Sequence, residues 1–164
     1  MHYAYLDSPA GPILVAGECE RDSLRSISFA KNGVATQPDP AWTESLHGAV
    51  GEALRQLREY FAGHRKQFDL PLAPQGTAFQ KSVWRQLQQI PYGITISYGE
   101  LAKRVGNPNA SRAVGSANGK NPLPIVIPCH RVIAGGGKLG GFSGGLDVKQ
   151  ILLRIESPVL QLPL

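Results

Sequence analysis

The sequence predicts a mixed α+β protein with two parts, residues 1–75 and residues 76–164. Short apolar stretches separated by turn residues dominate the first part, and helical spacing with helix-start signals dominates the second. The charge also changes sign. Residues 1–75 carry seven Lys and Arg against nine Asp and Glu, whereas residues 76–164 carry ten against three.

Composition narrows the class of protein. Hydrophobic residues make up 42% and charged residues 18% of the chain, as in a globular protein rather than a disordered one. No apolar run approaches the ~18 residues of a membrane span, and the first residues do not resemble a secretory signal. We therefore expect a cytoplasmic protein without a membrane partner.

The first part is expected to form a β meander followed by one helix. Apolar stretches at residues 3–6, 13–16 and 24–29 are separated by turn sequences at residues 8–11 and 20–23. A helix ending near Gly63 follows, because apolar residues recur at helical spacing: Leu46, Val50, Leu54, Leu57 and Phe61. Pro71, Pro74 and Gly76 mark the boundary between the two parts.

The second part begins with short helices that have clear start signals. Thr77 with Gln80 and Ser97 with Glu100 match the capping-box pattern, and Asp147 with Gln150 has an aspartate in the cap role. The first helix is expected to bury one side: Phe79, Val83, Trp84, Leu87 and Ile90. A second helix over residues 98–105 buries Leu101, Ala102 and Val105, and Asn109 caps a third that runs to about Asn118. The last pair predicts a helix-turn-helix.

The third helix has almost no side-chain bulk. Its residues include Ala110, Ser111, Ala113 and Gly115, so its backbone can approach another surface closely. Packing against another helix is one interpretation. Arg112 favours a second, because one long cation on a smooth helix suits insertion into a DNA groove. Between Gly76 and Arg131 one acid stands against seven bases, which also favours a polyanionic partner, although a basic face kept for solubility gives the same pattern.

The residues from Asn121 to Ile133 carry the candidate chemistry. Prolines at 122, 124 and 128 exclude a central strand, so we expect a stiff, extended, mostly apolar segment that ends at Cys129. Neighbouring cations lower a thiol pKa, and His130 and Arg131 follow directly. Cys129 and Cys19 lie far apart and have no second cysteine nearby, so neither a disulfide nor a zinc site is expected. The alternative for Cys129 is a small buried apolar residue.

In an extended chain, Cys129 and His130 project to opposite sides. A direct thiol–imidazole hydrogen bond, as in a cysteine hydrolase, is therefore not expected, but a water can connect the two groups. A carboxylate should orient the imidazole. The second part offers three: Glu100, Asp147 and Glu156. The alternative for His130 is a core histidine whose hydrogen bonds are satisfied.

Pro128-Cys129-His130-Arg131 resembles the active-site motif of the O6-alkylguanine-DNA alkyltransferases. The resemblance covers most of the second part in order and spacing: Ile90-Pro91-Tyr92-Gly93, Ser97-Tyr98, Asn107-Pro108, Ser111-Arg112-Ala113-Val114-Gly115, Asn121-Pro122 and Ser143-Gly144-Gly145. Residues 7–12 resemble the first hairpin of that family less specifically. The resemblance implies a ribonuclease H-like first domain and a second domain with a winged helix-turn-helix that binds DNA and carries the active site.

The resemblance also implies residue roles. Cys129 would accept the alkyl group, with His130 deprotonating it through a water, Glu156 holding His130, and Asn121 bracing the preceding turn. Tyr98, Val132, Phe142 and Ser143 would line the guanine pocket. Arg112 would fill the gap that the flipped nucleotide leaves, and the surface against the minor groove would include Ser97, Ala110, Ser111, Ala113 and Gly115.

The expected activity is DNA repair by irreversible, single-turnover alkyl transfer from O6 of guanine in double-stranded DNA to Cys129. No cofactor or metal is expected. We expect a monomer that binds DNA, and the sequence does not decide whether several molecules bind DNA cooperatively. Phe142 stands where many relatives carry tyrosine, so one hydroxyl is missing. The main alternative is a non-catalytic alkyltransferase-like protein that only binds the lesion, but such proteins lack the nucleophile. A helix-turn-helix regulator does not account for the Cys-His segment.

Overall fold

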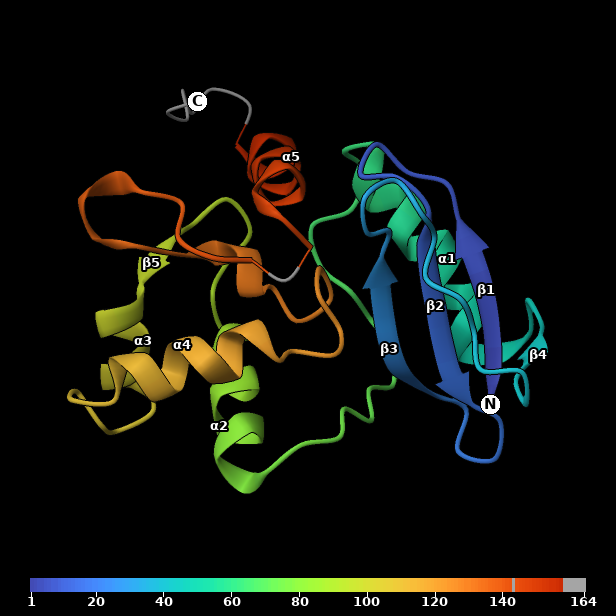
Figure 1. Cartoon of the computed structure of the whole chain (residues 1–164), viewed down its shortest axis with the longest axis horizontal. Coiled ribbons are helices and arrows are strands. Elements are labelled where there is room, and N and C mark those ends of the chain that lie inside the picture. The colour runs from blue at the N-terminus through green and yellow to red at the C-terminus, as the bar shows by residue number, and fades with distance from the viewer. Residues whose placement is uncertain (143, 158–164) are drawn as a thin grey trace. The chain divides into compact units, whose positions relative to one another are not determined.

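The computed structural model describes residues 1–142 and 144–157, and the chain divides into two compact units, Met1–Gln75 and Gly76–Leu164. Figure 1 shows a sheet with one helix in the first unit and mostly helices in the second, which confirms the predicted α+β class. None of the described helices combines the length and apolarity that a membrane span requires.

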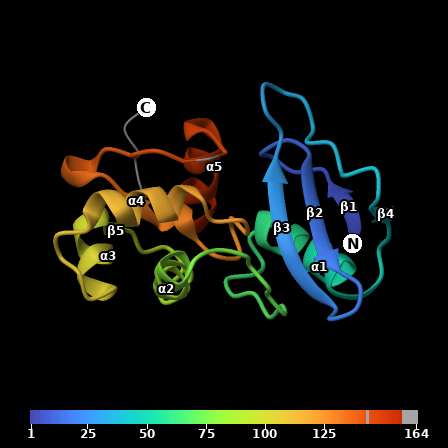
Figure 2. The same cartoon turned by 60° about the horizontal axis from the view of Figure 1, so that its bottom comes forward.

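The first unit is a four-stranded sheet in the order β3-β2-β1-β4. Strands β1 (His2–Leu6), β2 (Ile13–Glu18) and β3 (Ser23–Phe29) form the predicted antiparallel meander, and the two-residue β4 (Thr43–Glu44) pairs parallel to β1. Helix α1 (Gly48–Phe61) lies across one face of the sheet, as Figures 1 and 2 both show. Apolar side chains form the core between them, including Ile13, Val15, Leu24, Val50, Leu54 and Leu57.

Helix α1 begins later than its spacing predicts. Leu46 precedes the helix and is 66% exposed. The helix is capped from outside, since the Asp22 carboxylate accepts a hydrogen bond of 2.7 Å from the amide of Ala49. A cap supplied by the turn between β2 and β3 cannot be recognised from local sequence, because the two residues are far apart in the chain.

The second unit contains four α-helices in its described part: α2 (Ala78–Leu87), α3 (Tyr98–Arg104), α4 (Ser111–Gly119) and α5 (Leu146–Glu156). Both halves of the predicted capping box at Thr77 and Gln80 are present. The indole N–H of Trp84 donates to the carbonyl of Ala117 over 2.9 Å and so joins α2 to α4. Strands β5 (Ile96–Ser97) and β6 (Val132–Ile133), which the sequence did not reveal, pair in parallel.

Several local predictions were wrong. Phe79 is 39% exposed and Val105 is only half-buried. Helix α4 has no side-chain cap and begins after Ala110 rather than Asn109. Asp147 does not cap α5 but lies inside its first turn, where its negative charge interacts favourably with the positive end of the helix dipole. Each error concerns a helix end, where neighbouring segments decide the boundary.

Candidate active site

The segment before Cys129 is a series of turns rather than the extended chain we expected. Ile125 has a positive φ of 74°, and the amide of Ile127 donates to the carbonyl of Leu123 over 2.8 Å. Asn121 holds this turn closed. Its side chain donates to the Ile127 carbonyl over 2.7 Å and accepts from the Leu123 amide over 2.9 Å.

Cys129 begins a turn of 3-10 helix, η1 (Cys129–Arg131), so the predicted projection of Cys129 and His130 to opposite sides of a strand was wrong. The prediction failed because prolines exclude a strand without specifying what replaces it. The thiol is 1% exposed. Burial raises the pKa of Cys129 to about 11. This rise is only partly offset by hydrogen bonds from Asn121 and nearby backbone and by the charge of Lys149. The thiol is therefore protonated at rest.

His130 is fully buried and held at one ring nitrogen. Nε2 lies 2.5 Å from Glu156 Oε2. Because the carboxylate is ionised, Nε2 must carry the hydrogen and donate it. Nδ1 then has a free lone pair, and it has no hydrogen-bond partner among the described residues. Burial lowers the pKa of His130 more than Glu156 raises it, so the neutral ring is available as a base.

Arg131 does not have the role that we predicted for it. We expected its charge to lower the thiol pKa, but it forms a buried ion pair with Glu156, over 2.7 Å from Nε and 3.2 Å from Nη2. Burial alone would raise the pKa of Glu156, yet hydrogen bonds and charges from His130 and Arg131 lower it to about 2. Glu156 is thus the one of the three candidate acids that contacts the imidazole.

The Ile90-Pro91-Tyr92-Gly93 turn supports this ion pair. The Ile90 carbonyl accepts from Arg131 over 2.7 Å, and the Gly93 amide lies 3.3 Å from Glu156 Oε1. The Arg131 guanidinium also lies 5.7 Å from the centre of the Tyr92 ring. Buried charges need such partners on every side, which gives this motif a physical role that its sequence did not reveal.

Tyr98 lies at the first position of α3, where the pairing of β5 with β6 brings it close to the cysteine segment. Its ring lies between two glycines. A Cβ atom on Gly115 would come within 3.7 Å of the ring, and one on Gly140 would come within 3.1 Å of the ring and its hydroxyl. Burial and the charge of Cys129 raise the pKa of Tyr98. Tyr98 and Cys129 therefore border the same site.

The other predicted pocket residues follow β6. Val132 is fully buried in that strand, and Phe142 is half-buried in the loop before α5. Ser143, which we also expected at the pocket, lies outside the described residues. The structure thus brings Cys129, His130, Glu156, Asn121 and Val132 together in one buried cluster, with Tyr98 at its edge.

The surface of α4 has the smooth character that we expected. Arg112 and Ala113 are exposed, and Ala110, Ser111 and Gly115 are partly exposed. Ser97 is exposed too, and its hydroxyl caps α3 by accepting from the Glu100 amide over 3.0 Å. Six of the seven bases between Gly76 and Arg131 are exposed, since only Arg131 is buried. Within α4, Arg112 is thus an exposed cation among small side chains.

Two residues near the site were missed by the sequence analysis. Asn118 is buried in α4, its side-chain amide lies 3.4 Å from the carbonyl of Cys129, and it lowers the pKa of Tyr98 by a hydrogen bond. Lys149 is fully buried in α5. The helical period alone could have flagged Lys149, since it follows the buried Val148 and precedes the buried Leu152 and Leu153.

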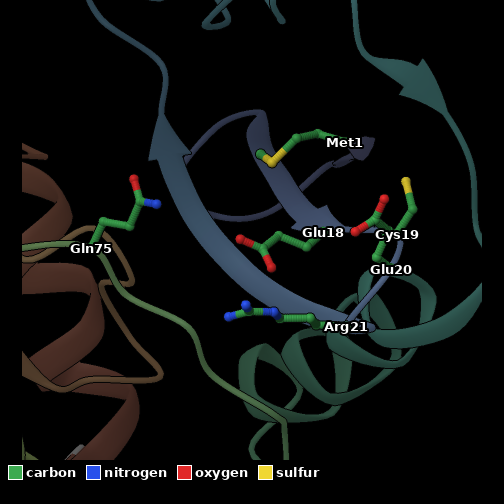
Figure 3. A pocket seen from close by; sticks show the side chains of 6 residues that line it. All are labelled: Met1, Glu18, Cys19, Glu20, Arg21 and Gln75. Carbon is green, nitrogen blue, oxygen red and sulfur yellow. The ribbon is translucent and has the colours of Figure 1, made fainter.

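A hollow of 590 Å³ lies in the first unit (Figure 3). It is open to solvent and lined by side chains from the end of β2, the turn after it and the two ends of the unit: Met1, Glu18, Cys19, Glu20, Arg21 and Gln75. None of the predicted site residues lines it. In the described part of the chain, no three His, Cys, Asp or Glu side chains gather in a metal-binding group.

Both units match known families. Residues 78–158 match the family described as "6-O-methylguanine DNA methyltransferase, DNA binding domain", and residues 1–74 match "6-O-methylguanine DNA methyltransferase, ribonuclease-like domain". The chain is 52% identical over 156 residues to the methylated-DNA–protein-cysteine methyltransferase of Methanosarcina acetivorans. The matched residues make up 95% of this chain and 98% of the relative. It is 47% identical to that of Mycolicibacterium paratuberculosis, covering 95% and 92%.

Solved structures are similar over the whole fold. A crystal structure of Mycobacterium tuberculosis OGT in complex with DNA matches with a TM-score of 0.86 at 44% identity, covering 96% of this chain and 94% of the other. A crystal structure of the O6-methylguanine methyltransferase from the same organism gives 0.84 at 43% identity, covering 99% and 96%.

Proposed function

Because the chain belongs to the 6-O-methylguanine DNA methyltransferase family, we propose that Cys129 is the residue that accepts the alkyl group. The protein is a DNA repair methyltransferase that transfers an alkyl group from DNA to a cysteine of its own. Its two cysteines are Cys19, which is exposed, and Cys129, which is buried. The substrate that fits this proposal is O6-alkylguanine in double-stranded DNA.

One observation carries the assignment of Cys129. It adjoins a buried, neutral imidazole whose Nδ1 is free to take a proton while its other nitrogen is fixed on a carboxylate. Cys19, by contrast, is exposed, and the described residues that line the hollow beside it include two acids and an arginine but no histidine. A nucleophile needs an oriented base to become active at neutral pH.

The reaction follows from this arrangement. A water carries the thiol proton of Cys129 to Nδ1 of His130, and Glu156 stabilises the imidazolium that forms. The thiolate attacks the alkyl carbon, so that an S–C bond forms while the bond from carbon to guanine O6 breaks. The electron pair stays on guanine, which takes up one proton. The resulting thioether is a poor leaving group, so each molecule reacts once and remains alkylated.

The DNA is approached by the smooth surface of α4, in the minor groove. The target base lies inside the duplex, so its nucleotide must first be flipped out, at a cost of a few kcal/mol. Arg112, as an exposed cation on α4, would occupy the space left in the base stack and offset part of that cost. The flipped guanine would lie against Tyr98 and Val132, with Phe142 closing the pocket.

The protein acts as a monomer in the cytoplasm, under this proposal. Both of its cysteines are unpaired, which suits the reducing compartment in which a thiol nucleophile persists. No step of the reaction calls for a cofactor, because the proton acceptor and the nucleophile are both side chains of the chain.

Intact-mass measurement after incubation with a duplex containing one O6-methylguanine tests the acceptor. Wild type and Cys19→Ser should each gain one methyl group, and Cys129→Ser should gain none. Repair by Cys129→Ser, or repair of more than one lesion per protein molecule, would contradict the proposal. Binding of the lesion by wild type without any mass gain would instead favour the non-catalytic alternative.

The role of Arg112 is tested by comparing two substrates. Arg112→Ala should slow methyl transfer from the duplex much more than alkyl transfer from free O6-benzylguanine, which needs no flipping. Arg154→Ala, which removes an exposed cation from α5, serves as the matched control and should affect neither. Equal losses on both substrates would exclude the flipping role of Arg112.

A further inference from the structure

Lys149 is a buried cation that the mechanism above does not use. It lies in α5 with none of its surface exposed. Its ammonium donates to three backbone carbonyls, over 2.7 Å to Val132, over 3.2 Å to Gly141, and to Leu139. An ammonium has three hydrogens, so each is used, and α5 is fastened to β6 and to the loop of residues 134–142.

This loop is rich in glycine and includes one short 3-10 turn, η2 (Gly135–Gly137). Five of its nine residues are glycine, and glycine loses more conformational freedom on ordering than any other residue. One backbone hydrogen bond closes its base, from the amide of Ala134 to the carbonyl of Lys138 over 2.9 Å. Two of the three carbonyls that Lys149 holds belong to this loop, so the ammonium supplies much of what orders it.

The same loop contacts Tyr98, which we propose binds the flipped guanine. The Gly141 carbonyl, which Lys149 holds, lies 3.5 Å from the hydroxyl of Tyr98. Gly140 lies against the Tyr98 ring, where a Cβ atom would come within 3.1 Å. The charges of Lys149 and Cys129 also influence each other's pKa. Lys149 is thus linked to Tyr98 through the Gly141 carbonyl that both side chains contact.

A purely structural role explains these contacts poorly. Burying an ammonium costs several kcal/mol that an apolar side chain of similar length would avoid, and burial lowers the pKa of Lys149 to about 8. We propose that Lys149 is a positioning residue for alkyl transfer, which fixes the loop of residues 134–142 and the Val132 carbonyl so that they receive the flipped guanine. This inference rests on the proposed pocket, to which it adds the element that shapes one wall.

The test compares a reagent that needs the pocket with one that does not. In Lys149→Met, transfer from free O6-benzylguanine should fall by about tenfold or more, because small misplacements of binding groups have large kinetic effects. Alkylation of Cys129 by iodoacetamide should change much less. Hydrogen exchange should quicken in residues 134–142 but not in α2. Arg154→Met, which removes an exposed cation from the same helix, is the control and should behave as wild type.

Three outcomes would overturn the proposal: a folded Lys149→Met that reacts with O6-benzylguanine at the wild-type rate, equal losses with both reagents, or unchanged exchange in the loop. If Lys149→Met does not fold, Lys149→Arg provides the second variant. It keeps the charge and donors but places them differently, so it should also lose more activity with O6-benzylguanine than with iodoacetamide. Failure of Cys129 as acceptor is recognised separately, by reaction of Cys129→Ser with O6-benzylguanine.

Discussion

Replacing Glu156 by glutamine tests the buried ion pair directly. The carboxylate accepts hydrogen bonds from both His130 and Arg131. Glutamine keeps one acceptor oxygen but presents an N–H group to a second donor, and it leaves the Arg131 charge buried without a counter-charge. Breaking a buried pair in this way typically costs about 3–5 kcal/mol.

The pKa of Glu156 leads to a similar magnitude. It falls from its ordinary value of 4.5 to about 2, and at about 1.4 kcal/mol per pKa unit the ionised carboxylate contributes about 3 kcal/mol to folding. Because the pKa is lower in the folded protein than in the unfolded chain, this contribution is complete above pH 4.5 and is lost as the pH falls towards 2.

Urea unfolding of wild type and Glu156→Gln measures this difference. At pH 7 the variant should be less stable by about 3 kcal/mol, and the difference should shrink on going to pH 3.5. Glu100→Gln removes a carboxylate that is 44% exposed and pairs with Arg104, so it should cost less than about 1 kcal/mol. A loss for Glu156→Gln no larger than that of Glu100→Gln, or a difference independent of pH, would refute the reasoning.

Two further predictions concern the loop and the thiol. Gly140→Ala should slow transfer from O6-benzylguanine, because its Cβ would come within 3.1 Å of the Tyr98 ring, whereas Gly33→Ala has a similar positive φ and nothing within 4 Å. Both should lose about 1 kcal/mol of stability to backbone strain, so equal kinetics would exclude the steric effect. In a Cys19→Ser background, iodoacetamide alkylation of Cys129 should keep rising with pH beyond pH 9, since burial raises its pKa to about 11. A plateau at lower pH would contradict this.

Local patterns in the sequence were sufficient for the longer strands and for the existence of the α-helices. Short apolar stretches and turn residues predicted β1, β2 and β3, and the pair Thr77 and Gln80 predicted the start of α2. These signals are reliable because the interactions behind them join residues only a few positions apart. The two-residue strands β5 and β6 carry no such signal, since their pairing joins residues 96–97 to residues 132–133.

The candidate site could be predicted as a set of residues but not as an arrangement. Cys129 first stood out as an unpaired cysteine after a proline-rich segment, and the family resemblance added Glu156. The sequence suggested that Arg131 would activate the thiol. In the structure Arg131 instead faces Glu156 and the Ile90 carbonyl, because the 3-10 turn at Cys129 brings both His130 and Arg131 to Glu156.

The sequence by itself predicted the α+β class and singled out Cys129 and His130 as the proposed nucleophile and base, because these depend on residue type and short spacing. Only the tertiary structure decided how their charges are balanced. Burial keeps Cys129 protonated and His130 neutral, Glu156 is ionised between two donors, and Lys149 carries its charge inside the protein. A pKa depends on the solvent exposure and neighbours of a group, and both are set by segments that lie far apart in the chain.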